Sequence, residues 1–348
     1  TTARGSAEYP PIEPGVRQIR GATVSYFRAA NGLQAFIAPA MIPALRARVR
    51  QFDVVHTHLL WAFPGIVATR IAAHAGVPYV VTPHACLDPW SLAQRRWMKK
   101  AFFAAFENRT LRRAAAIHYT ADAERAAVPD RFRDLPSAVV PNPIDIAEFA
   151  KIGDPAVRAA SRDVLILGRI HRMKGFDVLV PAIREVVARE PRARLVVAGA
   201  DEGGYRAAVE TMVREAGVAA SVTFTGHLDA LARTAALGRA ALVVQPSFRE
   251  NFGMSVAEAM AAGLPVVVSP QVNIAEDIRR AGAGLVVDRR PEALGRAILE
   301  LLADPARRAT MGERGRHWVA EAYSLRGVGV TLLKCYEDVL SRGGPRRR

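Results

Sequence analysis

The sequence predicts an α/β fold made of two Rossmann-like domains in tandem. Three observations lead to this prediction. The 348 residues are enough for two ordinary domains. Short Val- and Leu-rich runs alternate with stretches of helical periodicity along almost the whole chain, which is typical of helices packed on buried parallel strands. A polar break with several prolines, "VVPNPIDIAEFAKIGDPAVRAASR" at 139–162, separates two such series and indicates a linker between domains.

The apolar runs locate the strands and the periodic stretches between them locate the helices. The first series predicts strands at 22–27, 53–58, 78–83, 115–120 and 138–142, and the second predicts strands at 163–168, 194–199, 221–226, 241–246, 264–269 and 283–287. Helices are expected at 33–50, 91–113, 176–189, 204–216, 229–238, 253–262 and 292–303, with a helical tail over 306–341.

The break and the tail divide the chain into four parts. We expect an incomplete N-terminal domain on the acceptor side at 1–145 and a nucleotide-sugar-binding domain at 146–322. A helix at 323–341 is expected to pack back toward the first domain. The last residues, 342–348, read as a disordered basic tail.

Composition narrows the class of partner. The formal net charge of +15 favours anionic ligands such as nucleotides, acidic glycans or lipid headgroups. Nucleic-acid binding is not expected, because the sequence shows neither a recognition motif nor a predicted sheet face with interleaved aromatic residues. Cys86 and Cys335 fit neither a disulfide framework nor a metal site, and no apolar run is long enough for a membrane span. These features favour a cytoplasmic protein.

The stretch "FRENFGMSVAEAMAAGLPVVV" at 248–268 carries two carboxylates, Glu250 and Glu258, on either side of a loop-to-helix junction. A helix that begins at the carboxyl end of a parallel strand offers free N–H groups to a phosphate. Gly253 allows a ligand to approach the backbone closely. Glu258 can accept hydrogen bonds from a ribose diol, and Glu250 can bind sugar hydroxyls. The alternative, a helix whose acids meet only water, stays open on this stretch alone.

Three further strand ends carry polar residues. Gly168 is followed by Arg169 and then Lys174, two cations that can clamp a diphosphate, although a solvated basic loop has the same pattern. "GHLD" at 226–229 can present backbone groups to a nucleobase, and its Asp can cap the next helix.

In the first domain, "TPH" places His84 after a strand, where it can reach a sugar hydroxyl. His56, His58 and His118 are interpreted as structural, and no spacing among them predicts a metal site.

Taken together, the motifs "HTHLLWAFPG", "TPHACLDPW", "VVPNPID", "LGRIHRMKGFD", "FTGHL" and "PSFRENFGMSVAEAMAAGLPVVVS" resemble those of bacterial family 4 (group 1) retaining glycosyltransferases of the GT-B fold. The resemblance runs from about residue 50 to 325. It implies two Rossmann-like domains facing a cleft and a UDP- or GDP-linked sugar donor, with no cofactor and no metal. Fixed cations can take the place of a metal at the leaving diphosphate.

The resemblance also assigns roles to individual residues. It implies that His84, Glu250, Arg169 and Lys174 form the catalytic set, with Glu250 on the donor sugar and both cations on the diphosphate. It implies that Glu258 binds the nucleotide ribose. The remaining donor-binding positions it implies are Gly168, Gly226, His227, Leu228, Asn251, Phe252, Gly253 and Met254.

Two departures accompany the resemblance. The family usually has Gly where this chain has Pro143, so we expect a stiffer linker. The family opens with a strand, a Gly-rich loop, a helix and a second strand, and "TTARGS" resembles the end of that second strand. We therefore hypothesise that about one β-α-β unit is absent from the first domain.

The stretch 91–114 mixes Arg and Lys with Trp97 and three Phe residues. Such a helix can lie on an anionic membrane surface, as the inner face of the plasma membrane would provide. A core-packed helix with snorkelling cations is an open alternative.

The sequence thus predicts a hexosyltransferase that acts on a glycan or lipid-linked acceptor in cell-surface polysaccharide biosynthesis. A non-catalytic or truncated nucleotide-sugar-binding homologue and a GT-B-like sugar-nucleotide epimerase are the alternatives.

Overall fold

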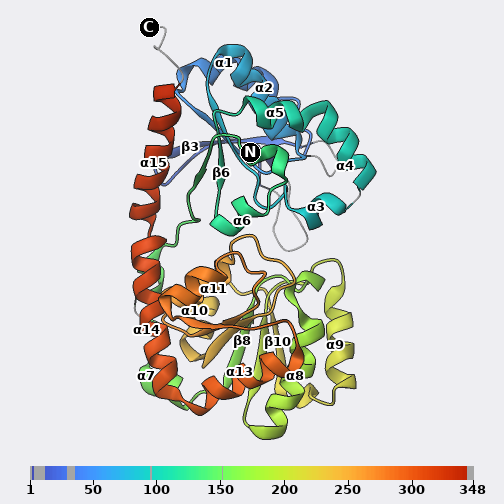
Figure 1. The fold of residues 1–348 in the computed structure, drawn as a ribbon, viewed down its shortest axis with the longest axis vertical. Helices are drawn as coiled ribbons and strands as arrows, with labels where there is room; N and C mark the ends of the chain where they lie inside the picture. The colour runs from blue at the N-terminus through green and yellow to red at the C-terminus, as the bar shows by residue number, and fades with distance from the viewer. Residues whose placement is uncertain (1, 4–11, 30–35, 95, 151, 343–348) are drawn as a thin grey trace. The chain divides into compact units, whose positions relative to one another are not determined.

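A computed structural model describes residues 2–3, 12–29, 36–94, 96–150 and 152–342 (Figure 1). The chain divides into two compact units. The N-terminal unit comprises Thr1–Val140 together with Val330–Arg348, and the C-terminal unit comprises Pro141–Gly329. The basic tail predicted at 342–348 lies outside the described residues except for Arg342. None of the described helices is long and apolar enough to cross a membrane.

The C-terminal unit contains a six-stranded parallel sheet in the order β10-β9-β8-β11-β12-β13. In chain order this is 3-2-1-4-5-6, the doubly wound arrangement of a Rossmann fold, whose order reverses between its first and fourth strands, here β8 and β11. The strands are β8 (Asp163–Leu167), β9 (Arg194–Ala198), β10 (Val222–Gly226), β11 (Leu242–Gln245), β12 (Val266–Val268) and β13 (Gly284–Val286). All six predicted strands of this series are confirmed.

Helices cover both faces of this sheet (Figure 1). Residues of α8, α9 and α13 form the core on one face, and residues of α10, α11, α12 and α14 form it on the other. The bounds are α7 (Pro155–Ala160), α8 (Phe176–Arg189), α9 (Tyr205–Glu215), α10 (Ala230–Arg239), α11 (Met254–Ala261), α12 (Ala275–Ala281), α13 (Pro291–Ala303) and α14 (Pro305–Ala322), with short turns η4 (Ile146–Phe149), η5 (Arg172–Lys174) and η6 (Ala219–Ser221).

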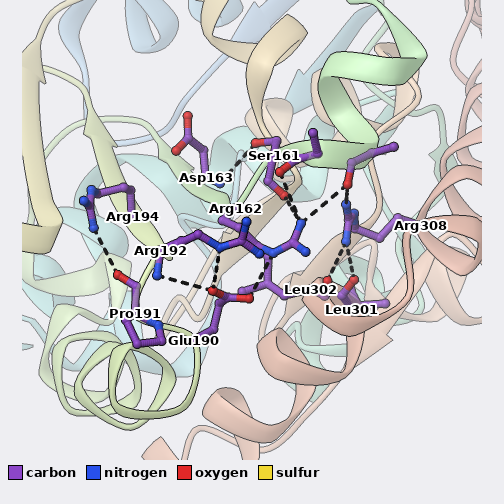
Figure 2. A network of polar contacts seen from close by, with 12 residues as sticks. Ser161, Arg162, Asp163, Glu190, Pro191, Arg192, Arg194, Leu301, Leu302 and Arg308 are labelled. Carbon is purple, nitrogen blue, oxygen red and sulfur yellow. Dashed lines mark hydrogen bonds and ion pairs between the residues drawn. The ribbon is translucent and has the colours of Figure 1, made fainter.

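The amino ends of β8 and β9 are held by an arginine network (Figure 2). Arg162 Nε donates to Glu190 Oε2 at 3.1 Å, and Arg192 donates to the other carboxylate oxygen at 3.3 Å. Arg308 is buried and donates to the carbonyl oxygens of Leu301 and Leu302. These bonds satisfy helix-end carbonyls that would otherwise be unpaired in the interior. The network lies at the amino edge of the sheet, opposite the carboxyl edge at which open parallel sheets bind ligands.

The N-terminal unit contains a four-stranded parallel sheet in the order β4-β5-β6-β7 and a separate three-stranded sheet in the order β1-β3-β2. The strands are β1 (Thr2–Ala3), β2 (Gly15–Ile19), β3 (Ala22–Arg28), β4 (Val55–His58), β5 (Tyr79–Thr82), β6 (Ala116–Tyr119) and β7 (Ser137–Val139). The helices are α1 (Met41–Arg48), η1 (Val49–Gln51), α2 (Phe63–Ala75), α3 (Pro89–Ala93), α4 (Arg96–Phe102), η2 (Phe103–Glu107), α5 (Asn108–Arg113), α6 (Asp122–Ala126) and η3 (Asp130–Phe132).

The first part of this unit differs from the prediction. The strand expected at 22–27 exists, but it pairs antiparallel with β2, which was not predicted. The two residues between them, Arg20 and Gly21, both have positive φ, as a tight two-residue hairpin turn requires. The helix expected over 33–50 begins only at Met41. Of the remainder, 36–40 is not helical and 33–35 lies outside the described residues.

The helix expected over 91–113 is interrupted. It ends first at Ala93 and resumes at Arg96. It then passes through one π-helical stretch, η2, before α5. Residue 95 lies outside the described part of the chain. Glu107, the last residue of η2, is buried and accepts a hydrogen bond from the backbone N–H of Trp61 at 2.8 Å. We infer that this buried bond holds the irregular turn in place.

The last helix, α15 (Leu325–Arg342), follows α14 after a two-residue break. Before the break, the backbone carbonyl oxygen of Tyr323 accepts a hydrogen bond from the Ile144 N–H at 2.7 Å. The Tyr323 hydroxyl donates to Asp277 Oδ2 at 2.6 Å. After Gly329, the helix belongs to the N-terminal unit, where Val339 is buried together with Val80. The hypothesis that about one β-α-β unit is absent from the first domain stays a prediction.

Candidate functional site

The candidate site in the C-terminal unit lies at the carboxyl ends of β8 and β11, where the strand order of the sheet reverses. Parallel sheets bind ligands at this position, because the loops on either side of the reversal diverge. Two loops meet there. The first follows β8 and carries Lys174 in η5, and the second follows β11 and carries Glu250. Lys174 Nζ donates to Glu250 Oε2 at 2.5 Å, across 76 positions of sequence.

The two loops are held together by backbone contacts. The Phe248 N–H donates to the Met173 carbonyl oxygen at 2.8 Å. Gly175, which follows Lys174, has φ +80°, and a Cβ atom there would lie 2.0 Å from the Pro246 carbonyl oxygen. Only glycine fits both the backbone angle and the space. The close approach of Gly175 to Pro246 therefore places the ammonium group of Lys174 beside the Glu250 loop.

Helix α11 begins directly after this loop, at Met254, with Gly253 as its N-cap. Gly253 has φ +91°, and no described side chain caps the helix. Its first-turn N–H groups and the positive end of its dipole are features that suit a phosphate group. Met254 is partly exposed there. Phe252, in contrast, is buried and its ring packs against the Tyr323 ring with centroids 5.1 Å apart, so its side chain belongs to the core. Its expected part in lining the donor pocket stays a prediction.

Glu258 lies one turn further along α11 and is mostly buried. Its Oε1 accepts from Arg233 Nη1 at 2.8 Å, and Arg233 also lies 3.5 Å from Glu148. Burial raises the pKa of the Glu258 carboxyl, while the nearby guanidinium opposes that shift. The structure thus places the Glu258 carboxylate and the Arg233 guanidinium together one turn beyond the start of α11. Arg233 was not among the predicted residues.

The other predicted positions of this unit line the same strand ends. Gly168 follows β8 directly and Gly226 ends β10, and the Gly226 carbonyl oxygen accepts from the Gly199 N–H at 2.9 Å. His227 is exposed, whereas Leu228 packs against the core. The predicted cap is confirmed: the carboxylate of the Asp at 229 accepts from the Ala232 N–H at 2.8 Å.

Arg169 and Asn251 complete the predicted set. Arg169 is exposed and forms an ion pair with Glu202, in the loop after β9, rather than with an acid of the β11 loop. Asn251 lies between Glu250 and Phe252 and is partly buried. The Lys174 and Arg169 cations therefore each have a carboxylate partner of their own.

The candidate site of the N-terminal unit is built on four histidines at the carboxyl ends of β4, β5 and β6. His84 Nε2 pairs with His58 Nδ1 at 3.0 Å, and the two rings stack with centroids 5.2 Å apart. His56 and His118 both pair with the Thr82 hydroxyl, at 2.6 and 2.9 Å. His56 also pairs with the Tyr336 hydroxyl of α15 at 2.7 Å.

Burial lowers the pKa of all four histidines, and neighbouring imidazoles lower it further for His56, His58 and His84. The pKa of His84 is lowered to about 4, mainly by burial and then by His58 and His118. The pKa of His56 is lowered to about 3 for the same kinds of reason, and the pKa values of His58 and His118 are also lowered. A neutral His84 can accept or donate a hydrogen bond at neutral pH, and its bond to His58 restricts which nitrogen carries the proton.

The backbone around His84 is strained. His84 and Ala85 have φ of +49° and +59°, an unusual conformation for residues other than glycine. The buried carboxylate of Glu124 stabilises it: one oxygen accepts from the Ala85 N–H at 2.6 Å, and the other accepts from the N–H and hydroxyl of Thr120 at 2.7 and 2.8 Å. Strain of this kind persists where the surroundings hold it, and it concentrates at functional sites.

The sequence analysis did not identify Glu124, Arg233 or Glu202, and it interpreted His56 and His58 as structural. For the two histidines a signal was present in the sequence. His56 and His58 are two apart on a strand, so both point to the same face, toward the loop that carries His84. Glu124, Arg233 and Glu202 have no comparable local signal. Among the described residues, no group of three or more His, Cys, Asp or Glu is arranged to hold a metal ion.

Comparison with known proteins matches both halves of the chain to family models. Residues 3–148 match Glycosyltransferase Family 4, and residues 151–318 match Glycosyl transferases group 1. A D-inositol 3-phosphate glycosyltransferase of Kineococcus radiotolerans is 33% identical over 90% of this chain and 80% of its own length. A 2-deoxystreptamine glucosyltransferase of Streptomyces kanamyceticus is 30% identical over 89% of this chain and 84% of its own length.

Solved structures show the same fold. A sucrose-phosphate synthase from Thermosynechococcus elongatus superposes with a TM-score of 0.75 at 21% identity, over 95% of this chain and 87% of that one. Anabaena Alr3699/HepE in complex with UDP and glucose gives a TM-score of 0.72 at 18% identity, over 90% of this chain and 85% of that one. The predicted GT-B class, with parallel sheets in two Rossmann-like domains, is confirmed.

Proposed function

The chain belongs to the group 1, family 4 glycosyltransferases, and from this premise we propose that it moves a hexose from a nucleotide-diphosphate sugar to a hydroxyl acceptor with retention of configuration. The observation that carries the proposal is the Lys174–Glu250 pair at the reversal point of the C-terminal sheet. It combines a cation for a leaving diphosphate with an acid for a sugar, beside an uncapped helix start.

The pair has a physical role in donor binding. The Lys174 and Glu250 side chains are only 16% and 21% exposed, so both charges lie in a partly dry environment where pairing is strong. A diphosphate that arrives at the start of α11 competes with Glu250 for the Lys174 ammonium. In our proposal, that exchange leaves Lys174 on the diphosphate and frees Glu250 to accept hydrogen bonds from the sugar hydroxyls.

Glu258 is proposed to bind the nucleotide ribose. Its carboxylate already accepts one hydrogen bond, from Arg233, and its second oxygen can accept others from a diol. Arg169 is proposed to approach the diphosphate by leaving Glu202, a rearrangement of exposed side chains that costs little. UDP and GDP are the nucleotides that we would test first to identify the base.

His84 is proposed to bind a hydroxyl of the sugar, with His58 as a positioning residue that fixes its ring. The attacking hydroxyl of the acceptor would lose its proton to the donor phosphate as the sugar–phosphate bond breaks on the same face. The fixed cations neutralise the diphosphate in this scheme, so we expect a chelator to leave the rate unchanged.

The acceptor is the open part of the proposal. The names of the two curated relatives indicate cyclitol acceptors for those proteins, whereas the motifs suggested a glycan or lipid-linked acceptor and polysaccharide biosynthesis. A peripheral contact with an anionic membrane is retained as a proposal, because Trp97 is 80% exposed and lies beside Lys100 on α4. Reduced flotation of Trp97→Ala with anionic vesicles would support that contact.

The deciding experiment is a transfer assay with UDP- and GDP-sugars against cyclitol, glycan and lipid-linked acceptors. We expect one donor to be consumed and the product to keep its anomeric configuration by NMR. Glu250→Ala should lower kcat at least about a hundredfold. Glu276→Ala, which removes an exposed acid of α12, is the matched control and should stay within twofold.

Two results would contradict the transferase. Saturable donor binding without transfer or hydrolysis would favour a non-catalytic binding protein. Recovery of an epimerised nucleotide sugar would favour the epimerase.

A further inference from the structure

A strongly basic cavity lies in the N-terminal unit, between α2 and α5. Its volume is about 600 Å³, within the range of small-molecule sites. Arg70 and His74 of α2 and Arg109 and Arg113 of α5 line it, together with Tyr79. Neither family motifs nor the proposed chemistry assign a role to these residues.

The cavity is at the opposite edge of the sheet from His84. Tyr79 is the first residue of β5, and Arg113 lies three positions before β6, so both mark the amino ends of parallel strands. His84 follows the carboxyl end of β5. A ligand in this cavity is therefore distinct from a sugar bound at His84.

The positive charge of the cavity is not neutralised by described residues. No carboxylate lines it, and Arg70, Arg109 and Arg113 form no ion pair with any residue that the structure describes. Glu107 interacts electrostatically with Arg70, but it is 2% exposed and directs Oε1 to the Trp61 N–H. The charge on the arginines is thus left facing solvent.

The spacing of the cations is unfavourable without an anion. Arg109 and Arg113 are four residues apart on α5, a separation at which like charges repel. The helix dipole favours Arg113, which lies in the last turn of α5, but it gives no such support to Arg70 and Arg109.

Two contacts give the cavity fixed walls. The guanidinium of Arg70 stacks on the Phe106 ring at 4.9 Å, and the Tyr79 hydroxyl donates to the Thr110 carbonyl oxygen at 2.8 Å.

We propose that this cavity binds a ligand with two neighbouring phosphate groups. Guanidinium groups bind phosphate through paired N–H donors, and the two helices offer arginines from both sides. The cavity exceeds the space of one inorganic phosphate, and its charge exceeds that of one phosphate monoester. The ligand is either a soluble bisphosphorylated molecule or a phosphorylated lipid headgroup, which share this chemistry.

Isothermal titration of the full chain with pyrophosphate tests the proposal. The donor site also attracts diphosphate, so Lys174→Ala serves to reduce that contribution. We expect saturable binding to persist in Lys174→Ala and to weaken at least tenfold when Arg109→Gln and Arg113→Gln are added. Arg112→Gln, an exposed arginine of α5 that does not line the cavity, is the matched control and should stay within twofold.

Flotation with vesicles that contain phosphatidylinositol 4,5-bisphosphate, against neutral phosphatidylcholine, separates the two sources. Flotation that is lost in Arg109→Gln/Arg113→Gln and kept in Arg112→Gln identifies a lipid headgroup, and pyrophosphate binding alone identifies a soluble ligand. Unchanged melting temperatures of the variants show that they fold. The proposal is overturned if Lys174→Ala abolishes all pyrophosphate binding and flotation does not depend on Arg109 and Arg113.

Discussion

Glu124→Ala is the sharpest test of how the N-terminal unit holds His84. The Glu124 carboxylate is 5% exposed and accepts three hydrogen bonds, two of them from the backbone N–H groups of Ala85 and Thr120. The substitution removes this acceptor from the buried N–H of Thr120 and from the partly buried N–H of Ala85. At about 1–3 kcal/mol for each group, the expected loss in the free energy of unfolding is about 2–6 kcal/mol.

Urea unfolding followed by circular dichroism measures this loss. Asp122→Ala removes an acid from the same short helix, but that side chain is 77% exposed and pairs with the exposed Arg125, so we expect a change below about 1 kcal/mol. Glu124→Gln keeps one acceptor oxygen and should fall between the two. If Glu124→Ala unfolds within 1 kcal/mol of the wild type, the carboxylate does not hold the strained backbone at His84.

Four further outcomes are expected. Gly175→Ala should lower the free energy of unfolding by at least about 2 kcal/mol in urea, because its Cβ would lie 2.0 Å from the Pro246 carbonyl oxygen. Because the pKa of His56 falls from 6.5 to about 3 on folding, the unfolded chain binds more protons between these values, so the melting temperature should be highest above pH 6.5 and fall as pH decreases toward 3. Arg308→Met should cost about 2–4 kcal/mol, since four carbonyl hydrogen bonds are lost from the interior. Glu258→Gln should weaken nucleoside diphosphate binding about tenfold in a titration and leave pyrophosphate binding unchanged.

Each of these outcomes has a contrary result. A stable Gly175→Ala would mean that the β8 and β11 loops separate without cost. A melting temperature that is flat from pH 7 to pH 4 would mean that His56 binds its proton at the same pH in the folded protein as in the unfolded chain. Equal effects of Glu258→Gln on both ligands would place Glu258 at the diphosphate instead of the ribose.

Local patterns of the sequence predicted most of the C-terminal unit. The helix expected over 176–189 has those bounds in the structure, and the cap at 229 is made by the residue expected to make it. These features depend on neighbours within a few positions, where periodicity and capping chemistry operate. The acid pair at 250 and 258 was visible for the same reason, because both residues belong to one loop-helix junction.

The tertiary structure decided which side chains meet. Lys174 and Glu250 are 76 positions apart, and the reversal of strand order between β8 and β11 brings them to 2.5 Å. Ala85 and Glu124 are joined in the same way across the carboxyl ends of neighbouring strands. The π-helical turn at Glu107 likewise depends on a distant partner, the Trp61 N–H. The hairpin of β2 with β3 depends on the two-residue turn between them.

The sequence by itself therefore determined the class of fold and the family, and it supplied the cations and acids that we propose for the donor site. Only the tertiary structure decided that Lys174 faces Glu250, that Arg233 faces Glu258 and that His84 is held neutral by burial among other histidines. The physical reason is range. Propensity and periodicity act between neighbours in sequence, whereas ion pairing and desolvation depend on which distant segments the sheet brings side by side.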